Sequence, residues 1–302
     1  MRQLVIDGRL INDEQPCYVV AEIGTNHQGS LEKAKELFAA AKSCGADAVK
    51  LQKRDNRTLF TKAMYDQPYN SEHSFGQTYG AHREALEFGK AGFTTLQRYA
   101  RELGITMFAT PWDVSSADVL AALDLPAYKI ASADLRNTPL LRHVARFGKP
   151  MLVSTGGGSE ADVRRAYDAI IPINPQLAIL QCTMSYPCEP EDLNLHVIET
   201  YRKLFPGVVI GFSDHQNGIA MAMIGYAFGA RIVEKHFTLN RAWKGTDHAA
   251  SLEPQGLFKL VRNLKATHLS LTYKKQELLP VEIVQREKLK YRSNKKNAEK
   301  TK

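Results

Sequence analysis

Two short apolar segments in the C-terminal half of the chain decide its fold: VVIGFSDH at 208–215 and RIVEKHFT at 231–238. Each is rich in β-branched residues, which is typical of a buried strand. Between them lies GIAMAMIGYAFG at 218–229, which is bounded by glycines and long enough for a helix. The three segments therefore predict a strand–helix–strand unit of a sheet that is covered on both faces.

The same alternation of strand and helix extends back through the chain and predicts an α/β fold. Eight strand–helix pairs in about 255 residues favour a (β/α)8 TIM barrel over an open doubly wound sheet. No GxGxxG follows the first strand, which argues against a dinucleotide-binding domain. The other strands are expected at 18–24, 48–53, 106–112, 127–134, 150–157 and 177–183, and the other helices at 31–45, 94–104, 115–125, 138–148, 160–171, 193–205 and 254–271.

Three segments of the chain stand outside this repeat. QLVIDGRLI at 3–11 predicts a β-hairpin with a tight Asp7-Gly8 turn, placed to close the bottom of the barrel. The long insertion at 54–92 falls on the C-terminal face, where such loops often cover or bind a substrate. We therefore expect an N-terminal hairpin (1–16), a TIM-barrel domain (17–272), and an extended connector leading into a disordered basic tail (273–302).

Composition indicates an ordinary soluble protein, with 302 residues, of which 44% are hydrophobic and 24% are charged. The formal charge of +8 lies mainly in residues 274–302, which hold ten Lys and Arg against four Glu. The remainder carries about +2, so we expect neither a nucleic-acid-binding surface nor, without a long apolar run, a membrane span.

The start of the chain and its cysteines indicate a cytoplasmic location. Asp7, Asp13 and Glu14 stand where a signal peptide would be apolar. The cysteines form no CxxC pair, which favours reduced, partly buried thiols. They are Cys17, Cys44, Cys182 and Cys188.

Polar side chains interrupt every predicted strand near its C-terminal end, where barrel enzymes collect their catalytic groups. Burying such a group without a partner costs on the order of 1–3 kcal/mol, so this many together indicate a polar cavity or a bound ligand. They are Glu22, Lys50, Gln52, Thr110, Lys129, Ser132, Asp134, Ser154, Thr155, Thr183, Ser213, Asp214, His215, Glu234 and His236.

His215 and His236 end neighbouring strands, whose ends lie about 5 Å apart. One hypothesis is that the two imidazoles bind one divalent ion and leave positions open for water and substrate. The alternative is two unrelated, hydrogen-bonded histidines. The acidic neighbours Asp214, Glu234 and Asp247 favour the metal, because they can orient ligands or substrate.

Lys50 and Lys129 lie within apolar strands, and three interpretations are open. Each can be a Schiff-base lysine, a point charge for a phosphate or carboxylate, or a lysine whose head group is paired within the core. Serines at 132, 154 and 213 favour an anion pocket. The run TGGGS at 155–159 either presents backbone N–H groups to an anion or is a plain connection.

Ten motifs, in the right order and spacing, resemble the sialic acid synthases, a family of N-acetylneuraminate synthases and N-acylneuraminate-9-phosphate synthases. The resemblance runs from about residue 16 to about residue 290. The motifs are AEIGTNHQGSLEKA (21–34), AVKLQK (48–53), TYGAHREALEF (78–88), FATPWD (108–113), AYKIASADLRNTPLL (127–141), GKPMLVSTGG (148–157), QCTMSYPCEPEDLNL (181–195), VIGFSDH (209–215), EKHFTL (234–239) and WKGTDHAASLEP (243–254).

This resemblance implies a transferase that condenses phosphoenolpyruvate with N-acetylmannosamine or its 6-phosphate, releases phosphate, uses Mn²⁺ or Mg²⁺, and forms a homodimer. It implies His215 and His236 as metal ligands, and Glu22, Asp134 and Lys129 as catalytic residues. The remaining roles follow from motif positions. Those matching phosphoenolpyruvate-binding positions are Lys50, Thr110, Lys129, Ser132, Ser154 and Ser213, and those matching sugar-binding positions are Gln52, Asp134, Tyr186 and Asp247.

The chain departs from the family pattern at a few places. Position 134 is Asp where many members carry Glu, and Met184 stands where some carry a polar residue beside the phosphate. The family normally continues into an antifreeze-like domain that reaches the partner's sugar site. Here a Lys-rich tail follows Leu289, so we expect that domain to be absent and the acceptor sugar to be the open question.

Three functions are compatible with this sequence. The first is an active sialic-acid-type synthase, and the second is a related synthase that makes another 3-deoxy-ulosonic acid from a different aldose. The third is a catalytically silent barrel that binds a full-length synthase. Glu22, Lys129, His215 and His236 are all present, which argues against the silent barrel.

Overall fold

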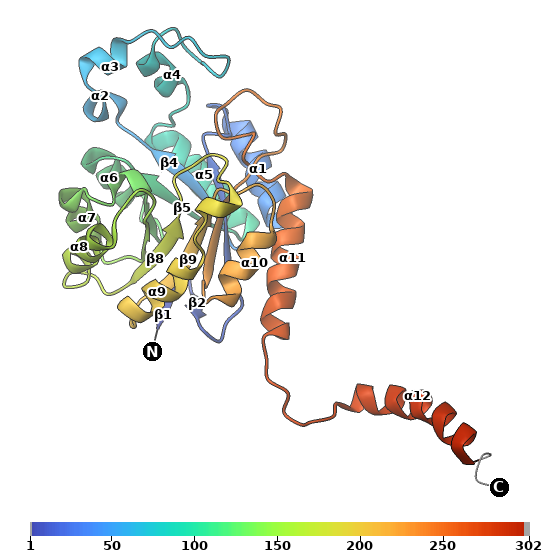
Figure 1. Ribbon diagram of the computed structural model, residues 1–302. Coiled ribbons are helices and arrows are strands. Elements are labelled where there is room, and N and C mark those ends of the chain that lie inside the picture. Colours follow the sequence, from blue (N-terminus) through green and yellow to red (C-terminus); the bar gives the residue numbers. More distant parts are fainter. Residues whose placement is uncertain (1, 299–302) are drawn as a thin grey trace. The chain divides into compact units, whose positions relative to one another are not determined.

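The computed structural model describes residues 2–298 and confirms the (β/α)8 barrel. Eight parallel strands close into one barrel, in which the last strand pairs with the first. Figure 1 shows the strands inside a ring of helices. The strands are β3 (Tyr18–Gly24), β4 (Ala48–Lys53), β5 (Thr106–Pro111), β6 (Tyr128–Ile130), β7 (Met151–Ser154), β8 (Leu177–Cys182), β9 (Val209–Asp214) and β10 (Ile232–His236).

Several of the surrounding helices begin at a residue whose side chain caps the first turn. The side chains of Ser30, Asp113 and Ser159 each accept a hydrogen bond from a backbone N–H of the first turn, as capping residues do. The helices are α1 (Leu31–Ser43), α5 (Lys90–Leu103), α6 (Val114–Ala121), α7 (Thr138–Ala145), α8 (Glu160–Ile170), α9 (His196–Leu204), α10 (Ala220–Ala227) and α11 (Pro254–Ser270).

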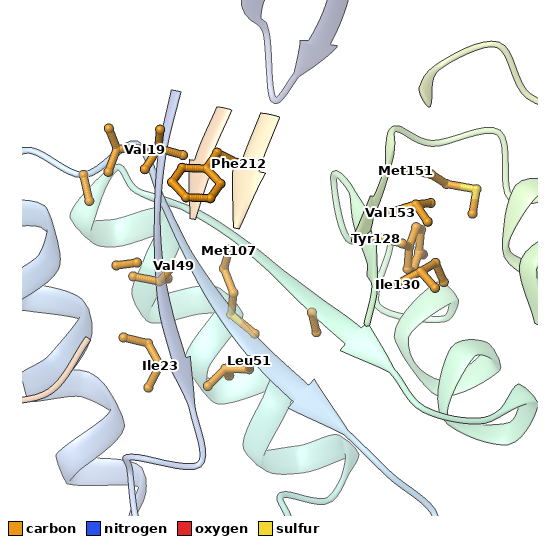
Figure 2. Packing of buried hydrophobic residues seen from close by; sticks show 14 of the residues in the cluster. Val19, Ile23, Val49, Leu51, Met107, Tyr128, Ile130, Met151, Val153 and Phe212 are labelled. Carbon is orange, nitrogen blue, oxygen red and sulfur yellow. The ribbon is translucent and has the colours of Figure 1, made fainter. Parts of the chain in front are cut away.

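Side chains alternate between two environments along each strand. Outward-facing residues such as Val19, Val49 and Tyr128 pack against the helices, and Figure 2 shows part of this layer. Inward-facing residues form a second apolar cluster that includes Val20 and Ile232. Two residues further along the same strands the inward positions are polar. The barrel interior is therefore apolar at its N-terminal end and polar at its C-terminal end.

The predicted hairpin closes the apolar end of the barrel. It consists of β1 (Gln3–Ile6) and β2 (Arg9–Asn12), which pair in antiparallel fashion. Asp7 and Gly8 both have positive φ, as a tight two-residue hairpin turn requires. Leu4, Ile6 and Ile11 join the apolar cluster inside the barrel.

Replacing Ile6 by alanine is expected to lower the free energy of unfolding by about 2–5 kcal/mol, because Ile6 is fully buried and the rigid strands around it cannot fill the cavity. Chemical denaturation measures the change. Val5→Ala is the matched control, since Val5 lies on the other face of the same strand and is 45% exposed. Equal losses in both variants would contradict the role of the hairpin as a plug.

The insertion at 54–92 folds into three short helices, α2 (Asn56–Leu59), α3 (Lys62–Asp66) and α4 (Tyr79–Ala85), which contact one another. They lie together at the top of Figure 1. Tyr69 and Tyr79 pack against the buried His82, and Phe75 joins the cluster. The insertion is therefore an ordered subdomain with its own aromatic core.

The C-terminal prediction of an extended connector and a disordered tail is wrong for part of the chain. The described residues divide at His268/Leu269, and the second unit contains helix α12 (Pro280–Ala298). Pro280 is tolerated in a first helical turn, and the Glu282 carboxylate accepts a hydrogen bond from the Leu279 N–H. These two features explain a helix in a segment that was expected to be extended and then disordered. Residues 299–302 of the predicted tail lie outside the described residues.

Within the described residues, no helix combines the length and the apolar character that a membrane span requires.

Candidate active site

A polar cavity of about 270 Å³ opens at the C-terminal end of the barrel. All eight strands or the segments that follow them contribute to its wall, as in barrel enzymes generally. Of the residues with a predicted site role, all but Asp134 line it. They are Glu22, Lys50, Gln52, Thr110, Lys129, Ser132, Ser154, Tyr186, Ser213, His215, His236 and Asp247.

Two lysines and two glutamates form a buried charge cluster at the floor of this cavity. The Lys50 Nζ lies 2.5 Å from a Glu22 carboxylate oxygen and 3.9 Å from Glu234, and the Lys129 Nζ lies 3.1 Å from Glu234. Burial alone would raise the pKa of Glu234, but Lys129 and then Lys50 outweigh it and lower that pKa. The paired charges explain how two lysines can be buried here.

Hydroxyl groups surround the two lysines. Thr110 accepts a hydrogen bond from Lys50, and Ser213 donates to Glu234. Ser132 accepts the backbone N–H of Gly156, whereas the buried Ser154 Oγ has no hydrogen-bond partner within the described part of the chain. An unpaired buried hydroxyl beside cationic groups is what an anion-binding pocket needs to offer its ligand.

His215 and His236 lie side by side in the cavity wall, with ring centroids 5.6 Å apart. The His215 Nδ1–H donates to the Thr183 carbonyl at 2.9 Å, which leaves Nε2 as an acceptor. Burial, and then the charge of His236, lower the pKa of His215 to about 3, so the ring is neutral at neutral pH. The His236 Nδ1 is buried without a hydrogen-bond partner among the described residues.

These features fit a divalent ion, since neutral imidazoles with a free ring nitrogen are its usual protein ligands. Among the described residues no group of three or more His, Cys, Asp or Glu is arranged to hold an ion. An ion held by His215 and His236 therefore needs water or substrate for its remaining positions. That is the arrangement of a catalytic rather than a structural site.

Three of the four predicted sugar-binding residues line the cavity: Gln52, Tyr186 and Asp247. Gln52 donates to Glu22 at 2.7 Å, and the Tyr186 ring lies over His215 at 4.1 Å between centroids. Thr25 reaches Asp247 at 3.5 Å. Burial would raise the pKa of Asp247, but His236 and hydrogen bonding lower it, so this carboxylate is ionised beside the histidines.

Asp134 lies in the short 3₁₀ turn Ser132–Asp134 and is not among the residues that line the cavity. One of its carboxylate oxygens accepts from Asn137 at 3.0 Å, and the other is buried without a partner in the described structure. Burial is the main reason that its pKa is raised. The predicted catalytic and sugar-binding roles of Asp134 thus stay predictions, without direct access to the cavity.

Several cavity residues carry no role in the sequence analysis. Glu234 was noticed as a strand-end carboxylate, but its position between Lys50 and Lys129 depends on three separate strands. Arg54 and Arg83 also line the cavity and were missed. A signal for Arg54 existed, because it continues the inward alternation from Lys50 through Gln52.

The fold and this site define a (β/α)8-barrel enzyme with an anion-binding active site. The NeuB family model matches residues 37–276, and the chain belongs to the NeuB family. Human N-acetylneuraminate-9-phosphate synthase is 43% identical, over 93% of this chain and 79% of the human protein.

Two further relatives agree with the family assignment. The N,N'-diacetyllegionaminic acid synthase of Legionella pneumophila is 35% identical, over 82% of this chain and 71% of its own length. The crystal structure of the N-acetylneuraminic acid synthetase of Leptospira borgpetersenii, in complex with citrate, superposes with a TM-score of 0.82 at 30% identity. That match covers 97% of this chain and 96% of the other.

Proposed function

We propose that this enzyme condenses phosphoenolpyruvate with N-acetylmannosamine or its 6-phosphate, giving a sialic acid or its 9-phosphate, plus phosphate. The observation that carries the proposal is the buried cluster of Lys50, Lys129, Glu22 and Glu234 beneath the paired histidines. It combines cations for a phosphorylated carboxylate with a carboxylate base. The 43% identity to human N-acetylneuraminate-9-phosphate synthase supports the same chemistry.

In this proposal the floor of the cavity holds phosphoenolpyruvate. Lys50 and Lys129 attract its phosphate and carboxylate, and the unpaired Ser154 hydroxyl is available to one of these anions. Thr110, Ser132 and Ser213 complete the pocket. Because the lysines are already paired with glutamates, no buried charge is left uncompensated in the free enzyme before the anionic substrate binds.

The bond changes follow from the chemistry of phosphoenolpyruvate. Carbon 3 attacks the aldehyde carbon of the acceptor, and water adds to the cationic carbon 2. The tetrahedral intermediate then releases phosphate with cleavage of the C–O bond. Glu22 would take the proton of that water. Its position in the cavity wall and the hydrogen bond that it accepts from Gln52 at 2.7 Å support this role.

His215 and His236 would hold the divalent ion, Mn²⁺ or Mg²⁺. When bound, such an ion polarises the aldehyde oxygen of the acceptor. Thr183 fixes the orientation of the His215 ring, and Tyr186 covers it on the side of the cavity. The resemblance in the sequence motifs also supports a homodimer, which light scattering on the purified protein would test.

The proposed reaction is tested by phosphate release. With Mn²⁺ we expect release from phosphoenolpyruvate only when an N-acetylmannosamine-type acceptor is present, and removal of the metal with EDTA is expected to abolish it. Phosphoenolpyruvate labelled with ¹⁸O in the bridging oxygen should deliver the label to phosphate, because the C–O bond breaks. Release from no acceptor in a panel of hexosamines, 6-phosphorylated sugars and pentoses would refute the proposal.

The same panel separates the two alternatives. A related synthase that makes another 3-deoxy-ulosonic acid would prefer a different aldose, and the similarity to the Legionella diacetyllegionaminic acid synthase is the observation that favours it. A catalytically silent barrel would bind neither metal nor phosphoenolpyruvate in calorimetry. The buried cluster of four charges argues against the silent barrel. Burying these charges costs free energy, and a protein without catalytic function would gain nothing in return.

A further inference from the structure

Two arginines line the cavity away from the lysine cluster. Arg54 lies four residues beyond Lys50, on the segment that continues β4, with Gln52 between them. At about 3.3 Å per residue this places the Arg54 backbone roughly 13 Å further toward the cavity mouth. The second arginine, Arg83, comes from α4 of the insertion.

The Arg54 guanidinium is held rigidly but is not fully satisfied. The residue is 6% exposed, and its guanidinium stacks on the Trp112 ring at 4.2 Å from the centroid. One nitrogen donates to Gln52, whereas Nη1 has no hydrogen-bond partner in the described structure and lies 3.6 Å from a Glu87 oxygen. A buried guanidinium with an unused donor favours binding of an additional acceptor.

Arg83 adds a second positive charge to the same wall. Its Nε and Nη2 donate to the Tyr79 hydroxyl at 3.1 and 2.9 Å, which orients the guanidinium. No carboxylate forms an ion pair with Arg83 among the residues whose side chains the structure describes, 2–289. Burial, and then the nearby charge of Arg83, lower the pKa of Arg54. Glu87 and Asp247 oppose this lowering of the Arg54 pKa, and Glu87 lies within ion-pair distance of Arg54. The charge of Arg83 lies beside them without an ion pair in the described part of the chain.

We propose that Arg54 and Arg83 form a second anion subsite, which binds the terminal phosphate of the acceptor sugar and selects the 6-phosphate over the free sugar. The inference rests on the proposed function, which leaves that choice open. A hexose 6-phosphate carries its aldehyde and its phosphate at opposite ends. The arginine pair lines the same cavity as Glu22 and the histidines, and Gln52 lies between Glu22 and Arg54, so one acceptor can contact both groups.

The test compares acceptor preference in four proteins: wild type, Arg83→Gln, Arg54→Lys and Arg98→Gln. The last is the matched control, because Arg98 lies on α5, does not line the cavity and loses the same charge. We expect wild type to favour N-acetylmannosamine 6-phosphate over N-acetylmannosamine in kcat/KM. That preference should fall about 10- to 100-fold in Arg83→Gln, the range of a lost charge-assisted hydrogen bond.

Arg54→Lys keeps the charge but loses the planar fork, so its preference should fall as well. Unchanged preference in both arginine variants would overturn the subsite. So would a wild-type enzyme that prefers the free sugar or N-acetylmannosaminuronate, which ends in a carboxylate. Arg98→Gln is expected to match wild type, and a similar fall there would also overturn the assignment.

Binding separates this inference from the proposed function. If no acceptor supports turnover, the proposed reaction fails, and calorimetry with N-acetylmannosamine 6-phosphate alone still decides the subsite. Binding to wild type that weakens at least 10-fold in Arg83→Gln would support it. Equal binding to both proteins, or no binding to wild type, would overturn it even if phosphate release from phosphoenolpyruvate is observed.

Discussion

Replacing His236 by alanine is expected to reduce Mn²⁺-dependent phosphate release by well over 100-fold, with little loss of stability. Removing a partner that merely orients a metal ligand typically costs 10- to 100-fold, so loss of a ligand should cost more. The His236 Nδ1 has no hydrogen-bond partner in the described structure, so its removal breaks no internal bond. Initial rates and thermal unfolding measure the two effects. His215→Ala should reduce the rate in the same way but cost more stability, because it also removes the hydrogen bond to the Thr183 carbonyl.

The control for the histidine variants is His196→Ala. His196 is exposed on α9, where it pairs with Glu199 outside the cavity, and its replacement should leave the rate unchanged. Metal binding by calorimetry gives a second readout that does not depend on turnover. Full activity of both His215→Ala and His236→Ala would show that these histidines do not form the catalytic centre.

Replacing Lys235 by methionine is expected to lower the free energy of unfolding by about 3–5 kcal/mol, because it leaves Asp214 as a buried, unpaired charge. Lys235 is 1% exposed, and its Nζ lies 3.0 Å from the Asp214 carboxylate. Asp214 and Lys235 each follow an inward-facing residue, Ser213 on β9 and Glu234 on β10. Their side chains therefore lie on the outer face of the barrel and link these two strands there. Chemical denaturation of the variant measures the loss.

The matched control for this prediction is Lys149→Met. Lys149 pairs with Asp124 at 2.8 Å, but both side chains are more than one-third exposed, so the loss should not exceed about 1 kcal/mol. A double variant, Lys235→Met with Asp214→Leu, should recover most of the stability, since it removes the orphaned charge. Equal losses at Lys235 and Lys149 would contradict the buried-pair argument.

The sequence predicted the barrel well because its periodicity is local. Apolar runs such as 208–215 and 231–238 become β9 and β10, and the helix between them becomes α10. The hairpin was predicted for the same reason, since its Asp7-Gly8 turn needs only local backbone conformations. The helix α12 was not predicted. A proline disfavours the interior of a helix, but Pro280 stands in the first turn, where it is tolerated.

The sequence predicted only part of the candidate site. Residues at strand ends were found because a closed parallel barrel must bring such ends together. All of them line the cavity except Asp134, Thr155, Thr183 and Asp214. Arg83 was missed because it lies on α4 of the insertion, and no periodic pattern shows where that helix packs. The lowered pKa of Glu234 could not be predicted from the sequence either, because it depends on the distances to Lys50 and Lys129, which lie on other strands.

The sequence by itself determined which residues alternate inward along each strand and that eight strands follow one another with helices between them. Hydrophobic periodicity encodes both, since it acts over a few neighbouring residues. Only the tertiary structure decided which charges meet. Lys129 and Glu234 lie 105 residues apart in the chain and 3.1 Å apart in the barrel, because its closure places their strands around one cavity. Pairing energies and pKa shifts depend on such distances, which no local pattern carries.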